Sequence, residues 1–198
     1  MHGQHNSRCL PWAAMLALAY APSAYALNDA DVFNTLLKNL DGVYVGLVAL
    51  AYTSGFILIG IAFSRMKKFG HITAFMHNNS GIVKPALLAL IGIVLMYTPS
   101  MLSVFYETLW GYSSVQSTTS WVASKASSDW RLALQSVIGL VQVFGLISFI
   151  RGWFLLTKIT SEQPQPGMTS KGIVHVVAGV LAINITGTID TIEATFGM

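Results

Sequence analysis

The chain has 198 residues, of which 54% are hydrophobic and only 10% are charged. A soluble domain usually carries about a quarter charged residues, so this composition excludes an ordinary water-soluble domain and indicates a surface that faces lipid. The formal net charge of +3 is small. Because the sequence has no stripe of Lys and Arg with interleaved aromatic residues, we expect no nucleic-acid binding.

Residues 1–26 have the pattern of a cleavable signal peptide. A mildly basic start precedes a short apolar run, Leu10 to Ala21, which falls below the roughly 20 residues that cross a bilayer. Ala24-Tyr25-Ala26 then places small residues where a signal peptidase cleaves. The alternative is a retained helix on the membrane surface. Cleavage would remove Cys9, the single cysteine of the sequence.

Four later segments are long and apolar enough to cross a membrane. They are Val43 to Phe63, Ile82 to Phe105, Leu134 to Leu156 and Ile173 to Ile192. Inside lipid only helices or closed barrels satisfy the backbone, and the alternation typical of barrel strands is absent. We therefore predict an all-α membrane protein with four transmembrane helices, arranged as two helical hairpins after the signal peptide.

The basic residues predict the orientation of these spans. Arg65, Lys67 and Lys68 lie in the turn between the first two spans, and Lys158 and Lys171 lie in the turn between the last two. The positive-inside rule places both turns in the cytoplasm of a bacterium. The protein is then a multi-pass inner-membrane protein with both mature termini in the periplasm.

This topology divides the mature chain into three parts. Residues 27–105 form the first hairpin, with a periplasmic N-terminus, and residues 134–198 form the second, with a periplasmic C-terminus. Residues 106–133 form a periplasmic loop rich in aromatic residues, Ser and Thr, which suits the membrane boundary or the surface of a partner.

The two hairpins resemble each other and predict an internal duplication. Gly55-Phe56-Ile57 is echoed by Gly145-Leu146-Ile147, about 90 residues later, and Gly81-Ile82-Val83-Lys84 by Gly172-Ile173-Val174-His175 at nearly the same separation. Parallel repeats of this kind occur in some transporters. The alternative is that any two apolar hairpins look alike.

Four polar residues are candidates for contacts inside the membrane. Arg151 lies within the third span, where a charge either snorkels to the headgroups, contacts another helix or serves conduction. His175 enters the fourth span at a similar depth and is a candidate acceptor for the Arg151 guanidinium. Asn184 and Thr186 make the fourth span polar, which favours a helix buried in an assembly or lining a wet path.

Small residues predict close helix packing. The candidates are Gly55, Gly60, Gly179 and Gly187. Glycine lets helix backbones approach closely, either within this chain or against other chains, and the sequence leaves both readings open.

Motifs of catalysis are absent from the sequence. It has no glycine-rich phosphate loop, no His or Cys cluster with metal-ligand spacing and no nucleophile elbow. We therefore expect a protein that is not an enzyme and that needs no cofactor or metal.

The segment from Gly172 to Thr188, GIVHVVAGVLAINITGT, is similar to a stretch of the small inner-membrane components of type IVB (Dot/Icm) secretion systems. The order of features also resembles that group, which includes DotE (IcmC), DotP (IcmD) and DotV. The resemblance implies a non-catalytic subunit of an effector-export channel, packed beside a DotA-type polytopic protein and sibling small subunits. The alternatives are a small autonomous transporter or channel with parallel repeats, and a pilin-like subunit.

Overall fold

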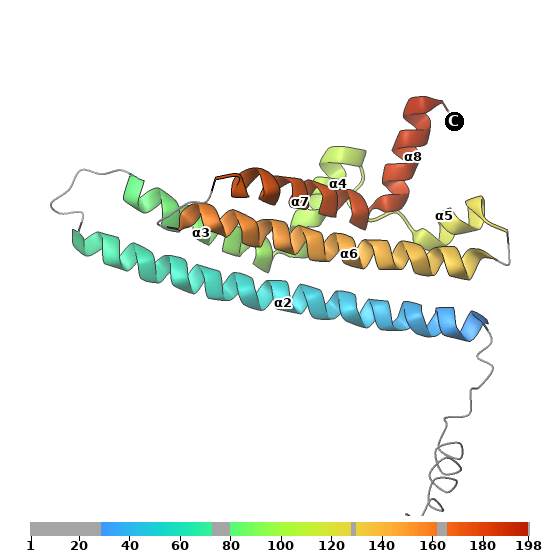
Figure 1. Cartoon of the computed structure of the whole chain (residues 1–198), viewed down its shortest axis with the longest axis horizontal. Coiled ribbons are helices and arrows are strands. Elements are labelled where there is room, and N and C mark those ends of the chain that lie inside the picture. The colour runs from blue at the N-terminus through green and yellow to red at the C-terminus, as the bar shows by residue number, and fades with distance from the viewer. Residues whose placement is uncertain (1–28, 73–79, 128–129, 162–165, 198) are drawn as a thin grey trace, which may run out of the picture.

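The computed structural model describes residues 29–72, 80–127, 130–161 and 166–197, and the regular elements among them are helices (Figure 1). The predicted signal peptide, 1–26, lies outside the described residues. Two helical segments, Asp31–Lys68 and Arg131–Thr160, are long and apolar enough to cross a membrane by themselves. Two bent helix pairs are also long and apolar enough when the two helices of each pair are counted as one segment. The described part of the chain therefore has two spans, or up to four if each bent pair is one span.

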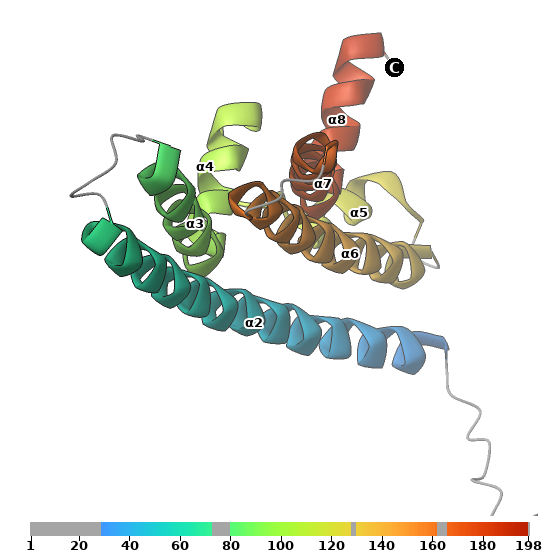
Figure 2. The same cartoon turned by 60° about the vertical axis from the view of Figure 1, so that its left-hand side comes forward.

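The helix α2, Asp29–Ile72, runs along the whole bundle (Figures 1 and 2). Its 44 residues would measure about 66 Å at 1.5 Å per residue, well beyond the thickness of a bilayer core. Ala51, Gly55 and Ala62 recur at helical spacing and are buried on one face. That face packs mainly against α3, Ser80–Met96, and also against α6, Arg131–Thr157.

Each long helix is followed in the chain by a pair of helices with a sharp bend. The helix α3 and α4, Thr98–Trp110, meet at 88°, and α7, Met168–Ile183, meets α8, Ile185–Phe196, at 89°. The second and fourth predicted spans are therefore not straight helices. The halves do share the same order of elements, a long helix and then a bent pair.

The bend between α3 and α4 follows from the sequence Tyr97-Thr98-Pro99. Pro99 lies in the first turn of α4 and has no backbone N–H to donate, and the residue before a proline disfavours the helical conformation. Thr98 is fully buried, and its hydroxyl donates to the carbonyl oxygen of Leu95 at 2.7 Å. This hydrogen bond satisfies one carbonyl that the break in the helix leaves open.

The connection between the halves contains the short helix α5, Thr118–Lys125, which packs on α6. The other end of α6 continues into one 3-10 turn, η2, Lys158–Thr160. The helix α7 returns antiparallel along α6 and makes the most extensive helix contact of the described chain. As Figures 1 and 2 show, α4 and α8 both project away from α2.

The main core lies between α4, α6 and α7. Phe149 is fully buried in it, with ring centroids 6.1 Å from those of Phe105 and Trp153 in edge-on geometry. The buried members of this core are Leu102, Tyr106, Leu146, Phe149, Val176, Val180 and Ile183. A smaller cluster, made of Ala51, Ile91 and Leu95, joins α2 to α3.

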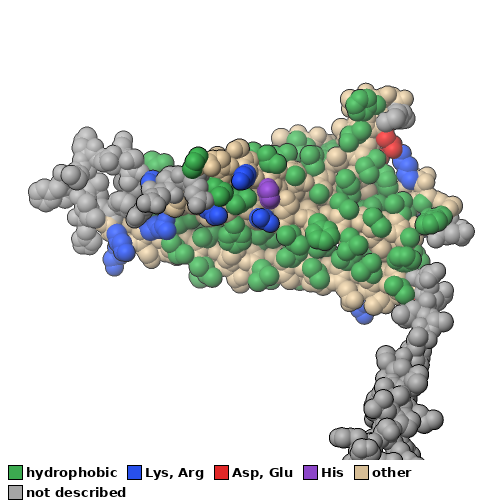
Figure 3. Space-filling view, viewed as in Figure 1, with side chains coloured by type: hydrophobic (Ala, Val, Ile, Leu, Met, Phe, Trp, Pro, Cys, Tyr) green, Lys and Arg blue, Asp and Glu red, His purple; other side chains and the backbone are tan. Residues whose placement is uncertain are grey.

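The outside of the bundle is strongly apolar. Figure 3 shows hydrophobic side chains over most of one face, with Lys and Arg gathered mainly toward one end. Phe56, Phe63 and Phe144 are each about two-thirds exposed within the chain. An apolar surface of this size needs lipid or other proteins to cover it.

Candidate functional site

The two turns predicted to share one side of the membrane lie at the same end of the bundle. The guanidinium of Arg65 donates to the backbone oxygen of Thr160 at 3.4 Å, which ties the end of α2 to η2. Lys67, Lys68 and Lys158 are exposed near this contact. We call this the basic end of the bundle. The opposite end, where α6 begins, carries α5 with Trp121, and Trp130 directly before α6, and we call it the aromatic end.

Arg151 and His175, predicted as neighbours, lie on the adjacent helices α6 and α7. Arg151 is exposed and His175 is half-buried. The hydrogen bonds of the described residues include none between these two side chains. The contact at this depth is instead made by Ser148, whose hydroxyl donates to the backbone oxygen of His175 at 3.1 Å. The exposure of Arg151 fits a side chain that snorkels or contacts another molecule.

Glycines allow α6 and α7 to pack closely against each other. A Cβ on Gly179 would lie 2.6 Å from the backbone nitrogen of Phe149 and 2.8 Å from the carbonyl oxygen of Gly145. Farther toward the basic end, a Cβ on Gly152 would lie 2.8 Å from the carbonyl oxygen of Gly172. Any larger residue would push these two helices apart. Gly179 therefore packs inside the chain.

The other three predicted packing glycines differ from one another. A Cβ on Gly55 would lie 2.5 Å from the carbonyl oxygen of Gly92, so Gly55 packs against α3. Gly187 contacts Tyr112, as described below. Gly60 is exposed and has no atom within 4 Å of a Cβ position, so it packs against nothing within the described chain.

Asn184 forms the bend between α7 and α8. It is fully buried, and its backbone lies outside the helical region with φ −104° and ψ 49°. Its amide group donates to the hydroxyl of Tyr112 at 2.9 Å, and its side-chain oxygen accepts from the backbone N–H of Gln116 at 3.2 Å. Asn184 thus fastens the loop after α4 to the bend. The sequence predicted a polar contact inside the membrane here, and the structure places it at a break in the helix.

Two further residues fix the direction of α8. Thr188 donates from its hydroxyl to the carbonyl oxygens of Leu181 at 3.0 Å and Asn184 at 2.9 Å. These bonds satisfy carbonyl groups that the end of α7 leaves without a helical partner. A Cβ on Gly187 would overlap the hydroxyl of Tyr112. Thr186 is fully buried beside them, and its hydroxyl has no hydrogen-bond partner within the described chain.

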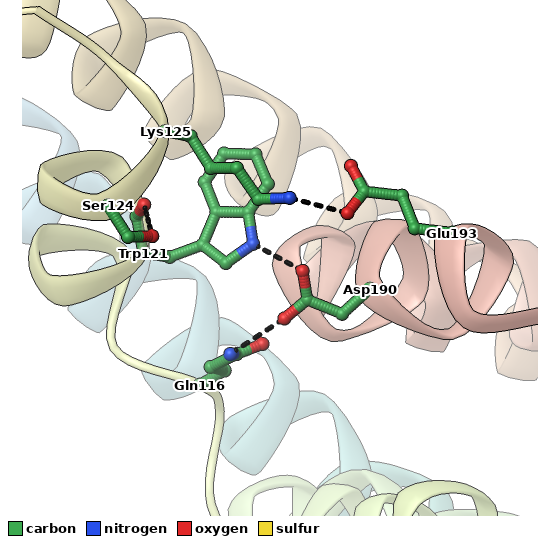
Figure 4. A network of polar contacts seen from close by, with 6 residues as sticks. All are labelled: Gln116, Trp121, Ser124, Lys125, Asp190 and Glu193. Carbon is green, nitrogen blue, oxygen red and sulfur yellow. Dashed lines mark hydrogen bonds and ion pairs between the residues drawn. The ribbon is translucent and has the colours of Figure 1, made fainter. Parts of the chain in front are cut away.

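A polar network joins α5 to α8 at the aromatic end (Figure 4). Asp190 accepts from the indole nitrogen of Trp121 at 2.7 Å and from the side-chain amide of Gln116 at 2.9 Å. Lys125 forms an ion pair with Glu193, and this hydrogen bond raises the pKa of Lys125. Sequence reasoning did not select Asp190 or Glu193. The available signal was an acid, Asp190, placed inside a predicted span, where charge is costly.

The loop from Gly111 to Ser117 borders two open cavities. One of about 430 Å³ lies between this loop, α2 and α6, and Asp41, Gln135 and Gln142 contribute polar groups to its wall. The other, of about 770 Å³, lies between α4 and α8. Gln116 borders both cavities, and its buried side-chain oxygen has no partner within the described chain. The described residues contain no group of three or more His, Cys, Asp or Glu that could hold a metal ion.

Comparison of the chain with protein-family models, curated proteins and solved structures finds no match in any of the three.

Proposed function

We propose that the chain is a non-catalytic structural subunit of a type IVB (Dot/Icm) secretion apparatus, in which it helps to build or gate the effector-export channel. The proposal originates in the resemblance of residues 172–188 to the small membrane components of those systems. Its partners are a DotA-type polytopic protein and sibling small subunits. The outward face of α2 is the structural observation that carries the proposal.

That face is uncovered by the rest of the chain. In the most apolar 18-residue stretch of α2, only 17% is buried within the chain, compared with 39% in the corresponding stretch of α6. Gly42, Gly46 and Gly60 lie on this outward face, and a Cβ on any of them would meet nothing within 4 Å. In lipid, small residues at such spacing favour close approach of another helix. A subunit that packs against partner helices explains why glycines lie where this chain itself does not use them.

Substitution of these glycines separates assembly from folding. Gly46→Leu and Gly60→Leu add side chains in open space and raise helix propensity, so the chain keeps its own fold. We expect both variants to co-purify with much less of the other membrane proteins than the wild type does. Val45→Leu, at a position 62% exposed beside Gly46, is the matched control and keeps normal co-purification. Wild-type yields of partners with both glycine variants would contradict the proposal.

The proposed location is the bacterial inner membrane, with the basic end in the cytoplasm and the mature termini in the periplasm. The support is the position of Arg65 beside Thr160, which groups the two basic turns. Thiol labelling in a Cys9→Ser background provides the test. In intact cells an impermeant reagent, admitted through the outer membrane, reacts with Ser120→Cys at the aromatic end and not with Lys68→Cys. The reverse pattern would overturn the orientation.

The second candidate is a small autonomous transporter or channel. The two bent helix pairs favour it, because broken helices in repeated halves form binding sites in many transporters. Purified chain in liposomes would then carry out substrate-dependent flux that Arg151→Ala or Asn184→Ala abolishes. The secretion subunit is inert alone. A pilin-like subunit would instead appear in sheared extracellular material, whereas a fixed subunit stays in the membrane.

A further inference from the structure

The loop from Gly111 to Ser117 reaches the interior of the bundle. Its backbone is irregular, and the N–H of Gln116 donates to the side-chain oxygen of Asn184 at 3.2 Å. Asn184 directly follows Ile183, whose backbone nitrogen would lie 2.7 Å from a Cβ on Gly145. Gly145 is near the middle of α6, a helix long and apolar enough to cross a membrane. Irregular backbone therefore lies at the depth of a span.

Backbone of this kind is tolerated at membrane depth only where protein covers it or where it lines a water-filled cavity. The chain itself does not cover the loop, because Gly111, Ser114 and Ser117 are exposed. The loop instead borders the two open cavities described above. The contents of these cavities therefore decide whether the polar groups of the loop are satisfied.

The cavity of about 430 Å³ has polar groups on its α2, α5 and α6 sides. The side-chain amides of Gln135 and Gln142 on α6 donate to hydroxyls at the start of α5, to Thr119 at 3.2 Å and to Thr118 at 3.4 Å. Asp41 lines the opposite wall, on α2. A wall of this kind is suited to water and not to lipid chains.

Asp41 has a charge that needs water. It lies within the span Asp31–Lys68, is exposed, and has no hydrogen-bond or ion-pair partner among the described residues. Leu40 beside it would lie 3.2 Å from a Cβ on Gly139, a residue of the α6 span. Carboxylates within membrane spans are costly unless they pair or face a water-filled cavity. The cavity supplies the second condition.

Gln116 also needs a partner from outside the chain. Its side-chain amide donates to Asp190 at 2.9 Å, which leaves the side-chain oxygen as an acceptor. That oxygen is buried and accepts no hydrogen bond within the described chain. Buried water commonly satisfies polar groups of this kind.

We propose that the cavity between α2, α6 and the loop is a water-filled vestibule, which opens at the aromatic end and ends at Gln116 and Ile183 inside the bilayer. Its volume holds on the order of ten water molecules. The charged group that the described residues place on its wall is Asp41, so it admits small cations in preference to small anions. The vestibule does not depend on a role in secretion.

Cysteine accessibility tests the vestibule. In a Cys9→Ser background, Ser117→Cys and Gln142→Cys place a thiol in the cavity wall. Val137→Cys and Phe144→Cys are the matched controls, since these apolar residues of α6 lie at a similar depth and are 55% and 66% exposed on its outside. The full chain is reconstituted in vesicles of phosphatidylethanolamine and phosphatidylglycerol, with a small water-soluble thiosulfonate on both sides. Elution profile and helix content of each variant verify the fold.

We expect positions 117 and 142 to react many-fold faster than positions 137 and 144. Unreactive cavity positions would overturn the proposal, because lipid or packed protein would then fill the space. Equal rates at all of these positions would overturn it as well, because α6 would then not be embedded in lipid.

Two further measurements test the opening and the charge preference. With reagent outside the vesicles only, chains that carry both Ser120→Cys and Gln142→Cys should be labelled at both positions or at neither, whichever way each chain is inserted. Labelling of one position without the other would place the opening elsewhere. The ratio of cationic to anionic reagent rates should be several-fold higher at position 142 than at position 120, and Asp41→Asn should remove that difference. An unchanged ratio in Asp41→Asn would overturn the preference for cations.

Discussion

The indole nitrogen of Trp121 donates a hydrogen bond to a carboxylate oxygen of Asp190 at 2.7 Å, across 69 residues of sequence. The second carboxylate oxygen accepts from the side chain of Gln116 at 2.9 Å. Asp190 therefore holds both α5 and the loop before it against α8. The arrangement at the aromatic end depends on this one acid more than on any other side chain described there.

Replacing Asp190 should loosen the aromatic end. Asp190→Ala removes two charge-assisted hydrogen bonds and should lower the free energy of unfolding by about 1–3 kcal/mol. Asp190→Asn retains an acceptor for one donor and should cost less. Thermal unfolding in mild detergent measures the difference. Equal stability of the alanine variant and the wild type would show that the network is not formed.

Two glycines of α2 should respond in opposite directions to the same substitution. Gly55→Ala forces a methyl group against the carbonyl oxygen of Gly92 and should destabilise the chain by about 1–3 kcal/mol. Gly60→Ala places the methyl group in open space and should be neutral or stabilising by up to about 1 kcal/mol. Unfolding of the two purified variants in denaturing detergent compares them directly. A similar loss in both would contradict the packing of α2 on α3.

Gly187 and Tyr112 should show coupled effects. Gly187→Ala places a methyl group on the hydroxyl of Tyr112 and should displace the loop or α8. Tyr112→Phe loses the hydrogen bond from Asn184, worth about 1 kcal/mol, but removes the nearest atom in the way and leaves the Asn184 amide nitrogen 2.6 Å from the Cβ position. The double variant should therefore be more stable than the sum of the two single losses predicts. If the loss in unfolding free energy of the double variant equals the sum of the two single losses, Tyr112 does not contact Gly187.

The ion pair between Lys125 and Glu193 should weaken at alkaline pH. The hydrogen bond to Glu193 raises the pKa of Lys125 above its ordinary value of 10.5. A raised folded-state pKa means that the stabilisation is fully present below pH 10.5 and is lost as the pH rises through the raised value. The melting temperature should therefore fall less steeply with rising pH in the Lys125→Gln variant than in the wild type. The same slope in the variant and the wild type would indicate that the pair contributes no stability.

The helical character of the chain follows directly from its sequence. Apolar runs of about 20 residues with almost no charge leave a helix as the expected structure in lipid. The positions of the bends were harder to predict. Pro99 is a local signal for the first, since it breaks the hydrogen-bond ladder near Thr98. Asn184 lacks such a signal, because its conformation depends on Tyr112 and Gln116, which lie 72 and 68 residues away.

Predicting the role of each glycine was limited in the same way. Gly55, Gly60, Gly179 and Gly187 look equivalent in the sequence, yet only a folded chain distinguishes a glycine facing Gly92 from one facing open space. The network around Asp190 also needed the fold, since α5 and α8 meet only after the chain has passed through α6 and α7. Secretion, membrane orientation and partners stay predictions.

The proposed role of α2 in binding partners is tested most directly by photo-crosslinking in the native cell. A benzophenone amino acid is placed at Leu50 or Thr53, exposed residues of the outward face that lie between Gly46 and Gly60, so that both glycines stay small. Tyr52, which is 49% exposed on the flank of α2, is the control. We predict crosslinks from positions 50 and 53 to other membrane proteins encoded with a secretion ATPase, and few from position 52. Crosslinks to lipid alone from positions 50 and 53 would contradict a subunit that assembles through α2.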